Sequence, residues 1–190
     1  MNKSKTIAGL ALLTAIVAVL QALSLAIPTG IFVLNLTLVP IVVGAALYGP
    51  KAGAWLGFVF SMIVLFTNAG AFLAVSIPGT ILTVLVKGTL CGFAAGVVYK
   101  LLEKVNGWLA VITAAIVSPI VNTGIFLLGC LIFFMPTINE WAAGSGFPSA
   151  GNYMIFGLVG INFIIEMAIN IVLSSIIVRI VRLGKNSNVA

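Results

Sequence analysis

The sequence predicts an all-α integral membrane protein, a bundle of six transmembrane helices with both termini in the cytoplasm. Composition is the first reason, because 62% of the 190 residues are hydrophobic and 6% are charged, whereas about a quarter of a soluble domain is charged. Six apolar stretches, most of them long enough to cross a bilayer core of about 30 Å, are the second. The third is that the loops with lysine or arginine alternate with loops that have neither. We treat residues 1–190 as one membrane domain.

Turn-forming residues separate the expected helices. Pro28 and Gly30 end the first helix, and Gly49 and Pro50 end the second. We interpret the first stretch as a retained helix rather than a signal peptide, because no small-residue cleavage site closes it. The second helix is short, and Pro40 within it predicts a kink. The expected helices cover residues 6–26, 32–48, 52–66, 80–102, 108–134 and 153–183.

The charge distribution predicts the orientation of the bundle. The loops 28–31, 67–79 and 135–152 contain no lysine or arginine, so their side is expected to face outward. Two of these outer loops are long, which favours a ligand site that opens outward beneath them. The alternative is that they are merely tolerated insertions. The basic residues on the opposite, cytoplasmic side are Lys3, Lys5, Lys51, Lys100, Lys104, Arg179, Arg182 and Lys185.

The missing residue types exclude several classes of function. The chain has no histidine, no aspartate and three glutamates, so neither a histidine metal site nor a catalytic acid–base pair is expected. We expect no cofactor, no metal and no enzymatic activity. No Walker motif is present, so the chain does not hydrolyse ATP by itself. The basic residues are scattered rather than clustered, which argues against nucleic-acid binding.

Polar residues inside the apolar spans are the best indication of a site. Asn162, Glu166 and Asn170 recur every four residues in the last span, so they stack along one helix face. A carboxylate at membrane depth is costly unless it faces protein or water and finds a partner. Lys87 is the only basic residue in the interior of the other spans, away from their ends, and it lies at a similar depth.

Two amides complete the candidate site. Asn122 lies near the middle of the fifth span and Asn35 near the outer end of the second. Together with Lys87, Glu166 and the amides of the last span, they are expected to line a small pocket in the outer half of the membrane. The alternative is a structural Lys87–Glu166 ion pair with the amides joining neighbouring helices.

Small residues at four-residue spacing mark the first span, where Ala11 is followed by Ala15. Such rows let helices approach closely. They predict either a docking face for another membrane subunit or ordinary packing inside the bundle.

Three segments carry a family resemblance: Ala-Leu-Leu-Thr-Ala at 11–15, Leu-Tyr-Gly-Pro-Lys-Ala-Gly-Ala at 47–54, and Val-Lys-Gly-Thr-Leu-Cys-Gly-Phe-Ala-Ala-Gly at 86–96. With six helices and a basic start, the chain resembles, over nearly its whole length, the substrate-binding S components of energy-coupling factor (ECF) vitamin transporters. The resemblance implies a multi-pass protein of the bacterial cell membrane. It also implies a vitamin as ligand and, as partners, a transmembrane T subunit and two cytoplasmic ATPases.

The resemblance also assigns roles to residues. The alanine motif, here Ala11 and Ala15, is the family's docking surface. The pocket is expected among helices four to six, which hold Lys87, Asn122, Asn162 and Glu166. Lys87 favours a carboxylate ligand such as pantothenate, with the amides binding its hydroxyls and amide group.

Two alternatives stay open at this point. Riboflavin is the second vitamin, because its ring would accept hydrogen bonds from asparagine and apolar walls. We expect no aromatic-rich cage of the kind that a thiamine binder has. An ion-coupled secondary transporter that uses Lys87 and Glu166 is the alternative outside the family.

Overall fold

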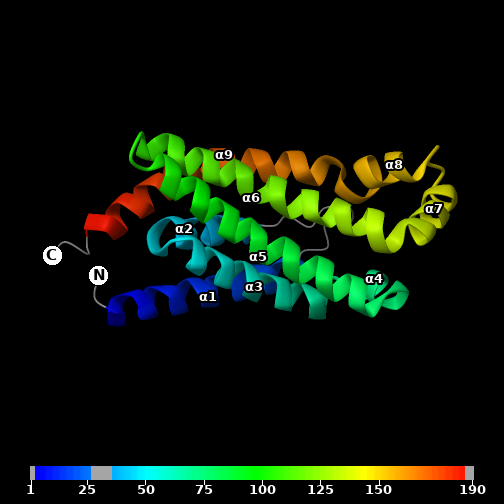
Figure 1. Ribbon diagram of the computed structural model, residues 1–190, viewed down its shortest axis with the longest axis horizontal. Coiled ribbons are helices and arrows are strands. Elements are labelled where there is room, and N and C mark those ends of the chain that lie inside the picture. The colour runs from blue at the N-terminus through cyan, green and yellow to red at the C-terminus, as the bar shows by residue number, and fades with distance from the viewer. Residues whose placement is uncertain (1–2, 27–35, 187–190) are drawn as a thin grey trace.

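The computed structural model describes residues 3–26 and 36–186 of the chain. Within these residues the regular secondary structure is entirely helical, which confirms the predicted all-α class (Figure 1). The helices are α1 (Lys3–Ala26), α2 (Leu38–Tyr48), α3 (Pro50–Thr67), α4 (Gly70–Val75), α5 (Ile77–Leu102), α6 (Gly107–Gly129), η1 (Cys130–Phe134), α7 (Met135–Gly144), α8 (Ala150–Asn152), η2 (Tyr153–Val159) and α9 (Gly160–Asn186), where η marks π-helix.

The number of membrane spans is only partly settled by these helices. Among the described residues, four stretches are long and apolar enough to cross a membrane, and a bent pair provides a fifth if it counts as one span. Helix α2 is apolar but has 11 residues. Six spans and cytoplasmic termini therefore stay predictions. The four stretches are Lys3–Leu23, Pro50–Thr67, Ile77–Leu102 and Gly107–Gly144, and the bent pair is Ala150–Val159 with Phe163–Leu173.

The long helices run side by side, and the short ones gather at one end. Helix α1 begins and α9 ends at the same end of the bundle, whereas α4, α7 and α8 lie at the opposite end (Figure 1). Large apolar side chains cover the outside, as with Ile7 at 68% and Ile132 at 70% exposure. Such a surface is suited to lipid rather than to water.

Both long loops of the prediction contain helix. In 67–79 the chain forms α4, and α5 begins at Ile77 rather than at residue 80. In 135–152 the helix continues through η1 into α7. Glycine and proline indicated loops here, but Pro78 and Pro136 occupy first turns of helices, where a missing N–H costs little. Pro40 likewise lies in the first turn of α2, so the predicted kink is wrong.

The predicted continuous helix 153–183 is broken. It consists of π-helical η2 followed by α9, with Gly160 between them at φ 47°. That left-handed backbone conformation favours glycine. The segments on the two sides of the break, Ala150–Val159 and Phe163–Leu173, meet at an angle of 40°. Because of this bend, residues on both sides of the break reach the cavity described below. They are Leu158 and Val159 before the break and Glu166 after it.

Glycines bring α3 and α5 into close contact. A Cβ atom on Gly57 would overlap the carbonyl oxygen of Gly88, and one on Gly92 would overlap the carbonyl oxygen of Gly53. The Ser61 hydroxyl crosses the same seam and donates to the Val84 carbonyl at 2.7 Å. Small residues at four-residue spacing thus hold two backbones together, and Lys87 is set beside this rigid seam.

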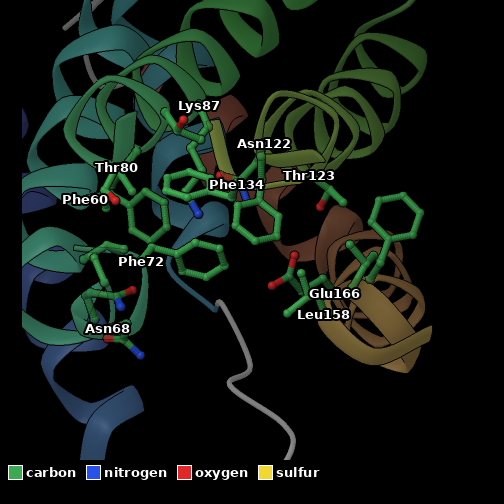
Figure 2. Close-up of a pocket in the computed structure, with 18 residues that line it drawn as sticks. Phe60, Asn68, Phe72, Thr80, Lys87, Asn122, Thr123, Phe134, Leu158 and Glu166 are labelled. Carbon is green, nitrogen blue, oxygen red and sulfur yellow. The ribbon is translucent and has the colours of Figure 1, made fainter. Parts of the chain in front are cut away.

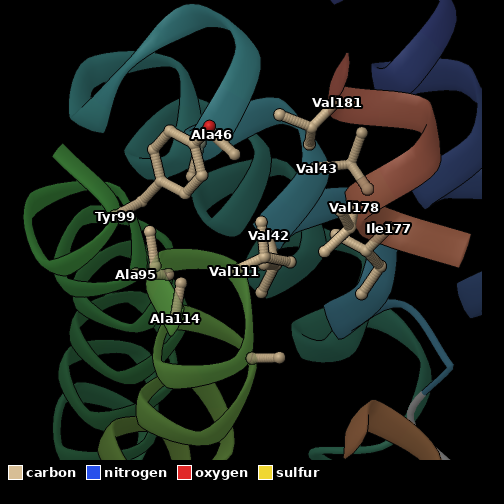
Figure 3. Packing of buried hydrophobic residues seen from close by; sticks show 13 residues of the cluster. Val42, Val43, Ala46, Ala95, Tyr99, Val111, Ala114, Ile177, Val178 and Val181 are labelled. Atoms are coloured by element: carbon tan, nitrogen blue, oxygen red, sulfur yellow. The ribbon is translucent and has the colours of Figure 1, made fainter. Parts of the chain in front are cut away.

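The largest cluster of buried apolar residues lies at the end of the bundle where α5 ends and α6 begins. There, valines of α2 pack against small residues of α5 and α6 and against the last turns of α9 (Figure 3). The cavity described below lies toward the opposite end, beside a second buried cluster that contains Phe134 and Ile138. The labelled members of the largest cluster are Val42, Val43, Ala46, Ala95, Tyr99, Val111, Ala114, Ile177, Val178 and Val181.

Candidate ligand-binding site

A cavity of about 340 Å³ lies among α1, α3, α4, α5, α6, η1, η2 and α9. Its wall combines two opposite charges, several amides and hydroxyls, and a set of phenylalanines (Figure 2). This mixture of apolar surface with a few polar groups is typical of small-molecule sites. The lining residues are Gln21, Phe60, Val64, Asn68, Ala69, Phe72, Thr80, Thr83, Val84, Lys87, Asn122, Thr123, Phe126, Phe134, Leu158, Val159, Phe163 and Glu166.

Lys87 and Glu166 supply the two charges of the cavity. The Lys87 side chain extends from α5 into the cavity, and its Nζ lies 5.2 Å from the centroid of the Phe126 ring (Figure 2). Glu166 is 5% exposed and approaches the cavity from α9. The ammonium and the carboxylate attract one another electrostatically. The side chains of the wall are therefore close to neutral in sum, while Lys87 presents a positive group to a ligand.

Phenylalanines form much of the wall. Five of them line the cavity, and the ring of Phe72 is at their centre. That ring meets Phe126, Phe134 and Trp141 edge to face, with centroids 5.6, 5.1 and 5.5 Å away. The expectation that no aromatic-rich cage exists is therefore wrong. The five are Phe60, Phe72, Phe126, Phe134 and Phe163.

Three of the six predicted site residues come together. Lys87, Asn122 and Glu166 line the one cavity, from α5, α6 and α9. Asn122 is 4% exposed, and among the described residues its Oδ1 has no hydrogen-bond partner. The polar groups of these three separate helices thus face a common space.

The other three predicted residues are placed differently. Asn170 is 1% exposed, but it is absent from the wall, and its Nδ2 donates to the Glu166 carbonyl at 2.9 Å. It therefore stabilises the helix turn beneath Glu166. Asn35 lies outside the described residues, and the side chain of Asn162 does too, although its backbone belongs to α9.

Gln21 is a wall residue that the sequence reasoning missed. It lies on α1, is 1% exposed, and accepts a hydrogen bond from the Thr37 hydroxyl at 3.1 Å. An amide inside the apolar first span is the same kind of signal that singled out Asn122. The threonines Thr80 and Thr83 and the phenylalanines give no such signal, because these residue types are common in membrane helices.

The small residues of α1 lie away from the cavity. Ala11 and Ala15 are both exposed. The opposite side of α1 faces the bundle, where Val17 is fully buried and the Trp55 indole of α3 donates to the Thr14 hydroxyl at 3.2 Å. Close approach by another helix is therefore possible at the alanines.

Comparison with known proteins identifies one family. The family model described as "ECF transporter, substrate-specific component" matches residues 5–181. Searches among curated proteins and among solved structures give no significant match. The matched range includes every described residue of the cavity wall.

Proposed function

Because the chain belongs to the family of substrate-specific components of ECF transporters, we propose that its cavity captures a small acidic vitamin, with pantothenate as the best candidate. Membership makes the protein a multi-pass membrane transport subunit, not an enzyme, and implies a T subunit and ATPases as partners. The vitamin enters from the outer side and is delivered through those partners.

The observation that carries this proposal is the Lys87 ammonium in a cavity whose wall combines phenylalanines with polar side chains. A cation at membrane depth needs a counter-charge. Glu166 supplies one within the protein, and a ligand carboxylate supplies a second when the site is filled. A hydrogen bond to a charged group contributes about 1.5–3 kcal/mol. A cationic vitamin such as thiamine would instead place its charge near Lys87.

The size of the cavity favours a compact ligand. Its volume of about 340 Å³ is near the lower end of the range of about 300–1,000 Å³ for small-molecule sites. Pantothenate is smaller than riboflavin and carries the carboxylate that riboflavin lacks. The five phenylalanines are the observation that favours riboflavin as a second candidate, because its planar ring stacks on aromatic walls.

Native mass spectrometry of protein purified without added ligand tests the proposal. A co-purifying mass equal to pantothenate, displaced by added pantothenate, is the expected result. A mass equal to riboflavin would select the second candidate. Transport by the purified protein in liposomes, without partners or ATP, would favour the ion-coupled transporter instead.

A further inference from the structure

The hydroxyl of Thr83 departs from the pattern of the other threonines. Helical threonines here donate to the carbonyl four residues earlier, as Thr80 does to Ser76 at 2.7 Å and Thr113 to Leu109 at 2.7 Å. Thr83 is 5% exposed, and its Oγ1 has no hydrogen-bond partner among the described residues. A buried hydroxyl without a partner is unfavourable, because it has lost its water and gained nothing.

Thr83 is tightly packed on one side and lines the cavity on another. Gly129 of α6 lies directly against it, so that a Cβ atom at Gly129 would overlap both the hydroxyl and the methyl group of Thr83. Thr83 also belongs to the cavity wall. A ligand in the cavity is therefore the partner that the position of Thr83 offers to its hydroxyl.

Asn122 is the second buried wall residue with a polar atom lacking a partner in the described part of the chain. The two residues lie to opposite sides of the contact between Lys87 and Phe126 along the bundle. Thr83 precedes Lys87 by four residues on α5, and Asn122 precedes Phe126, over whose ring the ammonium lies, by four residues on α6. Because α5 and α6 are antiparallel neighbours (Figure 1), the backbone of Thr83 is about one turn, roughly 5 Å, from Lys87 in one direction, and that of Asn122 is about one turn from Phe126 in the other.

We propose that Thr83 and Asn122 are specificity residues that form hydrogen bonds with polar groups of the ligand on the two sides of its charged anchor. The Oδ1 atom of Asn122 accepts from an O–H or N–H group, whereas the Thr83 hydroxyl, which both donates and accepts, bonds to a ligand hydroxyl or amide group. This deepens the proposed function, on which the acidic anchor rests. The site then takes small organic acids that carry a hydroxyl or amide group roughly one helix turn from the carboxylate. The same acids without these groups are rejected, because they leave the two buried side chains without partners.

Thermal unfolding of the ligand-free protein tests the first half of this proposal without any assumption about the vitamin. Thr83→Val keeps the shape and removes the unpartnered hydroxyl, so Tm should rise by about 2–4 °C. Thr113→Val is the matched control, because it removes a hydroxyl that is bonded within its helix and lies outside the cavity; its Tm should not rise. Equal behaviour of the two variants would overturn the proposal.

Calorimetric titration tests the second half of the proposal, the hydrogen bonds to the ligand. The ligands are pantothenate and its analogues that lack a hydroxyl or carry a methylated amide nitrogen. The wild type should bind pantothenate at least about tenfold more tightly than one of the analogues. Thr83→Val or Asn122→Leu should remove that preference, because each should weaken the binding of pantothenate and leave the binding of the analogue unchanged. Thr113→Val should keep the preference.

The outcomes separate the two proposals. If riboflavin binds and pantothenate does not, the proposal of an acidic vitamin fails. The proposal for Thr83 and Asn122 then stands only if Thr83→Val or Asn122→Leu weakens the binding of riboflavin, whose side-chain hydroxyls are also donors. If pantothenate binds the wild type and these two variants equally well, the proposal for Thr83 and Asn122 alone fails. If neither vitamin binds, both are overturned.

Discussion

The Nζ atom of Lys87 lies 5.2 Å from the centre of the Phe126 ring, in a cavity that also holds the Glu166 carboxylate. The ring face attracts the ammonium through its quadrupole, with a strength of about 0.5–2 kcal/mol. The contact leaves the N–H donors of Lys87 available for a ligand, because a ring face does not saturate them. Phe126 thus holds the charge in position between α5 and α6.

The α3–α5 seam should be sensitive to a single methyl group. Gly57→Ala places a Cβ atom on the carbonyl of Gly88, and backbone cannot move aside as a side chain can. We expect a loss of about 1–3 kcal/mol in the free energy of unfolding. Gly124→Ala on α6 is the control, because nothing lies within 4 Å of its Cβ position. Unfolding in detergent measures both, and equal stability of the variants would contradict the close packing.

The exposed alanines of α1 should matter for assembly and not for ligand binding. Ala11→Trp with Ala15→Trp adds bulk to a surface on the side of α1 away from the bundle. Vitamin binding by the isolated protein should be unchanged, whereas co-purification with the T subunit and uptake should fall. Leu128→Trp, at an exposed position on α6, is the control. Lost vitamin binding with intact assembly would make the alanines internal packing residues.

The orientation in the membrane can be tested by labelling. Cys91 and Cys130 are buried and free, so neither should react with an impermeant reagent, and both can stay in place as a silent background. A cysteine at Ser145 should then react with an impermeant reagent in intact cells, and one at Asn186 should be protected. The reverse pattern would place the termini outside.

Charges in apolar spans made part of the site predictable. Lys87 and Glu166 stand out from their surroundings, and a helix period places each at a defined depth, so their meeting in one cavity follows from the sequence alone. Phe72 and Phe134 could not be predicted in the same way. A phenylalanine in a lipid-facing position and one in a pocket have identical sequence surroundings when nearly every neighbour is apolar.

Backbone irregularities were the other part that sequence patterns did not show. The break at Gly160 depends on its positive φ, which it shares with Gly49 and Gly146 among the glycines that the structure describes. Helices α4 and α7 were mistaken for loops because glycine and proline indicate turns in general, whereas Pro78 and Pro136 begin helices here. Local propensity does not reveal which role such a residue takes.

The central claim is that Lys87 anchors the carboxylate of a vitamin. The most direct test is calorimetric titration of pantothenate into two variants, Lys87→Met alone and Lys87→Met with Glu166→Gln. Loss of a charge-assisted bond should weaken binding roughly ten- to a hundred-fold in Lys87→Met. The double variant removes the buried carboxylate left without its counter-charge, so it should recover thermal stability while its binding stays weak. Near-wild-type affinity in the double variant would show that the two charges only pair with each other, and would contradict the claim.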